Sequence, residues 1–203
     1  MSIAAAALAL YLIYLALAFG LRTIIQVRST GSSGFHGIDG EIGSATWLAG
    51  VGFVVALVLG LAAPVLALLD VMAPIDALGQ PGLQAAGIVL AITGTVATLV
   101  AQFAMGASWR IGVDPSERTA LVTSGPFALV RNPIFAAMLP TALGLVLMVP
   151  SAIAILGLIA LVASLELQVR VVEEPYLRSV HGQSYAEYAG RVGRFLPGLG
   201  KLA

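Results

Sequence analysis

The sequence of 203 residues contains no cysteine and only two histidines, His36 and His181. Without cysteine, disulfides, thiol nucleophiles and thiolate metal sites are excluded, and two histidines are too few for an ordinary zinc site, so we expect no metal. Charge is also scarce: 10% of the residues are charged, against about 25% in soluble domains. The net charge is zero, which gives no support to a nucleic-acid partner. With 59% hydrophobic residues, this is the composition of a membrane protein.

Five apolar runs dominate the chain: residues 3–21, 47–69, 83–105, 133–149 and 151–165. The first three are about as long as a helix that crosses a bilayer. No basic residue precedes the first run, so it lacks the n-region of a signal peptide and should remain as a helix. The last two meet at Pro150 without a charged residue, which predicts a tight antiparallel hairpin across residues 133–165. We therefore predict an all-α polytopic membrane protein with about five transmembrane helices.

The connector between the first two runs, residues 22–44, is rich in glycine and serine. It is long for a loop without structure of its own, and we expect it to be mobile and its histidine to be solvated. In the third run, Gly87 with Ala91 and Gly94 with Thr98 are small residues four apart. Such pairs predict close contact between helices in lipid.

The basic residues predict the orientation. Five spans place all of them on one side of the membrane and the acidic connector 70–82 on the other: Arg22, Arg28, Arg110, Arg118, Arg131, Arg170, Arg178, Arg191, Arg194 and Lys201. By the positive-inside rule, the N-terminus lies outside and the C-terminus is cytoplasmic. We expect an integral protein of a bacterial inner (plasma) membrane, with the lipid bilayer as its surroundings.

The stretch 121–139, LVTSGPFALVRNPIFAAML, changes from polar to apolar at Arg131-Asn132-Pro133. Asparagine is a favoured N-cap and proline a favoured first helical residue, so a helix should begin at Pro133. An arginine beside the positive end of that helix suits an anionic ligand group. The alternative is an arginine that only anchors the helix to lipid headgroups.

A hairpin returns the chain to the side from which it entered. Arg131 and Asn132 should therefore approach the charged residues that follow the fifth run: Glu166, Arg170, Glu173 and Glu174. Ionisable residues at the membrane surface indicate a functional site or a paired network, and a salt-bridge network that closes the hairpin is the alternative here. Because the residue before a proline avoids helical angles, Glu174-Pro175 should end one helix and start another.

An ordered series of motifs covers about the last 90 residues: Gly125-Pro126-Phe127, Arg131-Asn132-Pro133-Ile134-Phe135, Glu173-Glu174 with Leu177, His181-Gly182, Tyr185, Tyr188 and Pro197. This series resembles the isoprenylcysteine carboxyl methyltransferase and phospholipid methyltransferase group of integral-membrane enzymes. Each piece is a weak signal, and the order and spacing of the set make it strong.

The resemblance implies an enzyme that uses S-adenosylmethionine (SAM) to methylate a lipophilic acceptor. The C-terminal segments would wrap the cofactor at the cytoplasmic face, so we divide the chain into membrane helices in 1–107 and a catalytic region in 108–203. The carried-over cofactor residues are Gly125, Pro126, Arg131, Asn132, Pro133, Phe135, Glu173, Glu174, His181, Tyr185 and Tyr188. Arg131 or the helix N-terminus would take the carboxylate of SAM, and Glu173 or Glu174 its ammonium. Arg131 and Glu174 are the candidate catalytic residues.

Two departures from the family pattern affect the expected chemistry. Asn132 stands where the family has histidine, and Phe135 where it has tyrosine, so neither can act as general acid or base. We therefore expect the rate acceleration to come mainly from orienting and desolvating the reactants of an in-line displacement. A carboxylate acceptor needs no base, whereas an amine must be deprotonated, for which Glu174 or His181 would be available.

Three residues near the end of the third run are candidates for substrate binding. Gln102 is a strongly polar side chain near the end of that run, and Trp109 and Arg110 follow at interface depth. Trp109 is expected to anchor the protein at the interface more than to contact substrate, and Arg110 could equally bind an anionic substrate or a headgroup. The turn-like sequence Asp114-Pro115-Ser116-Glu117 does not indicate a metal site.

Two other classes of function compete with methyl transfer. A membrane reductase of the steroid-reductase type has similar C-terminal motifs and would bind NADPH, but the sequence shows no extra basic cluster for a 2′-phosphate. A non-catalytic scaffold would not need the polar set around Arg131 and Glu174, and a small transporter should carry ionisable groups at mid-membrane.

Overall fold

The computed structural model describes residues 2–35, 37–38, 40–110, 112 and 120–202. The long elements are all helical: α1 (Ile3–Leu15), α2 (Arg22–Thr30), α3 (Ala45–Leu68), α4 (Pro81–Met105), α5 (Pro133–Met148), α6 (Ala152–Leu167) and α7 (Glu174–Arg191). Two π-helical turns, η1 (Ala16–Leu21) and η5 (Gln168–Glu173), join α1 to α2 and α6 to α7. Short 3-10 turns are η2 (Asp76–Leu78), η3 (Gly106–Ser108) and η4 (Gly125–Ala128).

Four continuous helices are long and apolar enough to cross a membrane, and α5 is a fifth, shorter apolar helix. The predicted all-α fold with about five spans is therefore confirmed, as is the tight turn of the hairpin. Ser151 caps α6 by accepting a hydrogen bond from the amide of Ala154 at 3.2 Å. Only the first half of the long helix Ala152–Arg191 is apolar, so α6 is its membrane-spanning part.

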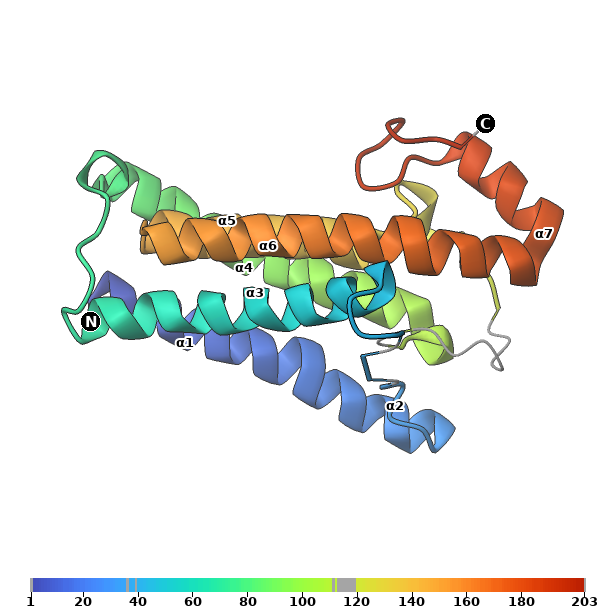
Figure 1. Ribbon diagram of the computed structural model, residues 1–203, viewed down its shortest axis with the longest axis horizontal. Coiled ribbons are helices and arrows are strands. Elements are labelled where there is room, and N and C mark those ends of the chain that lie inside the picture. Colours follow the sequence, from blue (N-terminus) through green and yellow to red (C-terminus); the bar gives the residue numbers. More distant parts are fainter. Residues whose placement is uncertain (1, 36, 39, 111, 113–119, 203) are drawn as a thin grey trace.

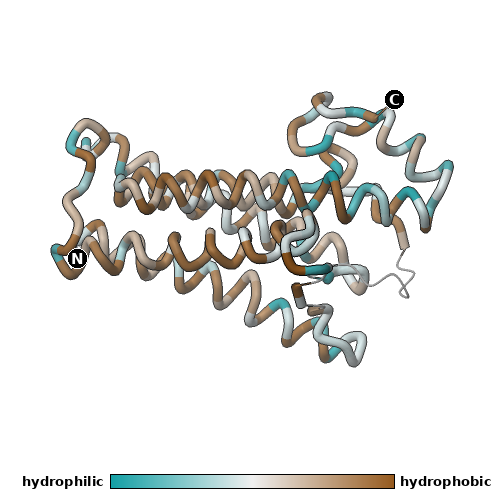
Figure 2. The backbone as a smooth tube through the Cα atoms, in the orientation of Figure 1, coloured by the Kyte–Doolittle hydropathy of each residue, from teal (hydrophilic) through white to brown (hydrophobic). Residues whose placement is uncertain are grey.

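The helices lie side by side along one axis (Figure 1). The N-terminus and the connector between α3 and α4 are at one end, while α2, α7 and the C-terminus are at the other. Hydrophilic residues gather at this second end, and hydrophobic residues fill the middle (Figure 2). The basic residues of α2, α7 and the C-terminal tail therefore lie in segments at this second end, as five spans require.

The expected loop at 22–44 is wrong for its first nine residues, which form α2. No helix breaker lies between Leu21 and Thr30, and the helix ends at Gly31, whose left-handed φ of 78° suits glycine. The guanidinium of Arg22 donates a hydrogen bond to the carbonyl of Gly106 and lies 4.6 Å from the centre of the Trp109 ring. These contacts hold α2 against the end of α4.

The predicted break at Glu174-Pro175 is also wrong, because the helix continues from α6 through η5 into α7. The wider π turn accommodates a proline without an amide hydrogen, and Glu174 keeps helical angles of −62° and −44°. The backbone leaves helical geometry later, at Gly182, where φ is 50°.

Close packing of small residues joins the spanning helices in pairs, as the spacing in the third run predicts. A side chain at Gly144 of α5 would come within 2.5 Å of the amide of Ala91 in α4, and one at Gly87 within 2.6 Å of the carbonyl of Gly144. On the other side of the bundle, a side chain at Gly52 of α3 would meet the hydroxyl of Ser164 in α6 at 2.5 Å. Two pairs, α4 with α5 and α3 with α6, thus form the core of the bundle.

Candidate active site

A cavity of about 360 Å³ opens between the spanning helices at their polar end; we call it the chamber. Its membrane part is lined by apolar side chains that include Phe19, Phe53 and Met138. Its polar end is lined by most of the residues predicted for the site: Gln102, Trp109, Arg110, Arg131, Asn132, Pro133, Phe135, Glu173, Glu174, Tyr185 and Tyr188. The fold therefore gathers these residues around one cavity that is charged at one end and apolar at the other.

Arg131 is 6% exposed and holds the C-terminal segment in place. Its terminal nitrogens donate hydrogen bonds to the carbonyls of Ala189, Val192 and Gly200, at 2.9, 2.5 and 3.0 Å. A fourth bond, of 2.7 Å, goes to Oε1 of Glu174. Arg131 therefore uses its terminal nitrogens within the protein, and it builds the floor of the chamber.

Glu174 sits between two arginines. Oε1 accepts hydrogen bonds from Arg131 and from Nε of Arg194, both at 2.7 Å, and Oε2 accepts one from Arg194 at 2.9 Å. Burial alone would raise the pKa of Glu174, but the hydrogen bonds from Arg194 and Arg131 outweigh burial and lower it. This carboxylate is held in its charged form and is a poor proton acceptor.

The neighbouring Glu173 has the opposite character. It is partly buried and lines the chamber. Burial raises the pKa of Glu173 to about 7, against the opposing effects of a hydrogen bond with Gln168 and the charge of Arg110. Glu173 can therefore gain or lose a proton near neutral pH, which makes the two adjacent glutamates chemically distinct.

The chain after α7 folds back over the start of α5. An isolated parallel bridge joins Val130 to Gly193, and the amides of Arg131 and Asn132 donate to the carbonyls of Gly193 and Arg194 at 2.8 and 3.1 Å. A side chain at Gly193 would collide with the carbonyl of Leu196, so this fold requires glycine. The return of the C-terminal tail thus brings Arg194 to Glu174.

The predicted helix start at Pro133 is confirmed, but Asn132 makes no side-chain cap bond. Its amide group instead donates to the carbonyl of Arg194 at 3.1 Å. Two tyrosines of α7 complete this wall. The hydroxyl of Tyr188 donates to the carbonyl of Phe127 at 2.6 Å, and the ring of Tyr185 packs edge-on against the ring of Tyr188, with 6.3 Å between the ring centres. Asn132 and Tyr188 therefore contribute to the shape of the chamber through contacts with the backbone.

The candidate substrate residues line the chamber on the α4 side. Trp109 is 3% exposed beneath the guanidinium of Arg22, so it packs inside the protein and the expectation of an interfacial anchor is wrong. The guanidinium of Arg110 lies 4.9 Å from the centre of the Tyr176 ring. Gln102 donates to the carbonyl of Ala18 at 2.9 Å and ties α4 to the first helix.

Some expectations fall elsewhere. Gly125, Pro126 and His181 do not line the chamber, and Glu166 pairs with Arg170 on the exposed surface, whereas the acidic partner of Arg131 is Glu174. The sequence 114–117 and His36 lie outside the described residues. Sequence reasoning missed Tyr14, Phe53, Gln168 and the role of Arg194, and it named Leu177 in a motif without giving it a place in the site. Leu177 lies four residues after Glu173, about one helical turn, which could have placed it there. Gln168 lies five residues before Glu173 and lines the same chamber through the π turn of η5.

Comparison with known families matches residues 83–184, half of the chain, to the family described as phospholipid methyltransferase. The matched stretch runs from α4 through the hairpin into α7, and it includes Arg131, Glu173 and Glu174. No curated protein and no solved structure matches the chain significantly.

Proposed function

This chain belongs to the phospholipid methyltransferase family, and we propose that it uses SAM to methylate a lipophilic acceptor held in the chamber. The family makes the protein a membrane methyltransferase. The donor and the class of acceptor rest mainly on one observation, which is that a single cavity joins the charged residues at Glu173 and Glu174 to an apolar volume between the spanning helices.

The polar end of the chamber has groups that fit the donor. SAM combines a carboxylate, an ammonium and an adenine ring, and when bound it would supply a methyl group on its sulfonium. Glu173 would pair with the ammonium, and Arg110, whose side chain lines the same end, would take the carboxylate. The rings of Phe135 and Tyr185 would pack against adenine or face the sulfonium.

We assign Arg131 and Glu174 a positioning role. Each is buried, and each is engaged with the other and with the C-terminal tail. Their network fixes the start of α5 against α7, and so it sets where Glu173 and Phe135 lie. Methyl transfer from a sulfonium is an in-line displacement, in which positioning of this kind lowers the barrier.

The chemistry of the acceptor decides whether Glu173 also moves a proton. A carboxylate acceptor attacks directly, whereas an amine acceptor must first lose a proton. Glu174 was one expected base, but its bonds to two arginines oppose this role; His181, the other, does not line the chamber. For an amine acceptor, Glu173 is the chamber carboxylate that remains, and it would take the proton only while it is not paired with the ammonium of SAM.

The polar end of the bundle would face the cytoplasm, in a bacterial inner membrane with the N-terminus outside. The positive-inside rule supports this orientation, because α2, α7 and the C-terminal tail carry their arginines at that end. The NADPH-dependent alternative gains little from the chamber: among its described lining residues the basic ones are Arg110 and Arg131, and Arg131 is engaged by Glu174 and backbone carbonyls.

Methyl transfer tests the proposal directly. The purified protein in liposomes would be incubated with SAM carrying a radiolabelled methyl group, and the label would be counted in the lipid extract and identified by mass spectrometry. We expect labelled lipid with the wild type, a loss of at least about tenfold with Glu173→Ala, and no change with Glu187→Ala on the exposed face of α7. A wild type that labels no lipid, in liposomes that contain both amine and prenyl-carboxylate acceptors, would contradict the proposal.

A further inference from the structure

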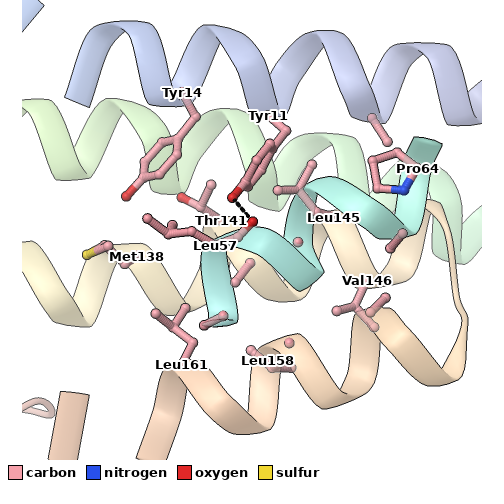
Figure 3. A pocket seen from close by; sticks show the side chains of 17 residues that line it. Tyr11, Tyr14, Leu57, Pro64, Met138, Thr141, Leu145, Val146, Leu158 and Leu161 are labelled. Carbon is pink, nitrogen blue, oxygen red and sulfur yellow. Dashed lines mark hydrogen bonds between the residues drawn. The ribbon is translucent and has the colours of Figure 1, made fainter. Parts of the chain in front are cut away.

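A second, smaller cavity of about 60 Å³ lies deeper in the bundle than the chamber (Figure 3). Its walls come from α1, α3, α5 and α6, and these four helices also line the chamber, together with α4. Tyr14 and Met138 lie toward one end of the view, and Pro64 and Val146 toward the other.

The two cavities lie in series along the bundle. On each of the four helices, the residues that line the small cavity continue directly from those that line the chamber. Three residues line both cavities, namely Tyr14 of α1, Leu57 of α3 and Met138 of α5. Along α1 and η1 the lining runs from Phe19 through Tyr14 to Ala7, a path of about 18 Å at 1.5 Å per residue.

We propose that the small cavity is the terminal subsite for one extended hydrocarbon chain of the methyl acceptor, and that Tyr14, Leu57 and Met138 form a partition that sets how far this chain reaches. The inference rests on the proposed function, because the chain's reactive head lies in the chamber. It adds to that function a determinant of chain length in the middle of the membrane.

The wall of the small cavity suits an apolar occupant. Beyond the partition at Tyr14, its polar side chains are used within the protein: Tyr11 donates to the carbonyl of Leu57 at 2.6 Å (Figure 3), and Thr141 to that of Ala137 at 3.2 Å. A polar ligand group would find no partner there, whereas a hydrocarbon chain needs none. Small residues leave the space open: Ala7, Ala56, Gly60, Ala63, Ala142, Ala154 and Gly157.

The partition is built from side chains that can move. The buried hydroxyl of Tyr14 has Thr98 of α4 as its polar neighbour and is held less firmly than the hydroxyl of Tyr11, which bonds to Leu57 at 2.6 Å. Rotation of the Tyr14 ring therefore costs at most this one weak contact. Met138 is unbranched and adapts readily to a neighbouring guest. An arriving chain can thus pass between these residues, while Tyr11 keeps the deeper wall fixed.

The test uses two homologous series of acceptors: lysophosphatidylethanolamines that differ only in acyl-chain length, and prenylcysteines that differ only in the number of isoprene units. Leu158→Phe fills the small cavity from α6, and Leu156→Phe places the same change on the outward face of that helix, where Leu156 is 55% exposed. We expect Leu158→Phe to lower kcat/KM for the longest accepted chain by about tenfold more than for the shortest, and Leu156→Phe to keep the wild-type profile. Met138→Ala opens the partition and should extend the profile to longer chains.

The same profile of chain lengths in Leu158→Phe and Leu156→Phe, both folded and active, would overturn the subsite but leave the proposed function intact. Methylation of neither series by the wild type would overturn both. A measurement independent of activity is crosslinking with a lysophospholipid that carries a diazirine at the chain end. Crosslinks to residues that line the small cavity, such as Leu145, Val146, Ala154 and Leu158, competed by the unlabelled lipid, are expected, and crosslinks confined to outward-facing residues such as Leu156 would refute the subsite.

Discussion

Glu173→Gln should change how the stability of the protein depends on pH. The pKa of Glu173 rises from its ordinary value of 4.5 to about 7 because the folded protein buries the carboxyl group. The folded state therefore holds this proton more tightly than the unfolded state. The protonated carboxyl group therefore contributes to the stability of the fold, and this contribution is fully present below about pH 4.5 and is lost as the pH rises to about 7. At about 1.36 kcal/mol per pKa unit, the loss has an upper limit of about 3 kcal/mol.

Glutamine keeps the shape of the neutral side chain and cannot ionise, so the variant should escape this loss. Thermal unfolding in detergent, followed by tryptophan fluorescence, would compare wild type, Glu173→Gln and the exposed control Glu187→Gln from about pH 4.5 to about pH 8. We expect Glu173→Gln to match the wild type at the acidic end and to melt at a higher temperature at the alkaline end. A difference between variant and wild type that does not change with pH would refute the assignment.

Two further substitutions test the polar end and the helix packing. Glu174→Ala leaves the buried Arg131 and Arg194 without their shared carboxylate, so it should lower the free energy of unfolding by about 3–5 kcal/mol and weaken S-adenosylhomocysteine binding. The control Glu187→Ala should change neither. An unchanged melting temperature in Glu174→Ala would contradict the network. Gly144→Ala would place a methyl group 2.5 Å from the amide of Ala91, and it should lower the free energy of unfolding by about 1–3 kcal/mol in the same melts. At Gly82 an added methyl group has nothing within 4 Å, so Gly82→Ala should lose no stability through contact. Equal melting temperatures for the two variants would argue against close packing of α4 and α5.

The parts of the fold that follow local chemistry could be predicted from the sequence. The apolar runs had the length of spans, Asn132-Pro133 indicated the start of α5, and small residues four apart indicated that α4 packs closely against another helix. The hairpin also predicted that Arg131 and Glu174 meet, 43 positions apart in sequence, because a chain that enters and leaves on one side must bring its ends together.

The parts that depend on long-range packing could not be predicted in this way. A proline after Glu174 normally marks a helix boundary, and only the widened turn of η5 lets the helix continue. The adjacent Glu173 and Glu174 also could not be assigned different roles from the sequence. Arg194 reaches Glu174 only because the tail folds back over Arg131, and this contact separates a fixed carboxylate from one that titrates near neutral pH.

The most direct test of the account is whether the polar end of the chamber binds a sulfonium donor or its product. Calorimetric titration of the detergent-solubilised protein with S-adenosylhomocysteine and, separately, with NADPH would decide this. We expect saturable binding of S-adenosylhomocysteine that is weakened in Glu173→Ala and kept in Glu187→Ala, and no binding of NADPH. Saturable binding of NADPH, with none of S-adenosylhomocysteine, would contradict methyl transfer and assign the chamber to a reductase.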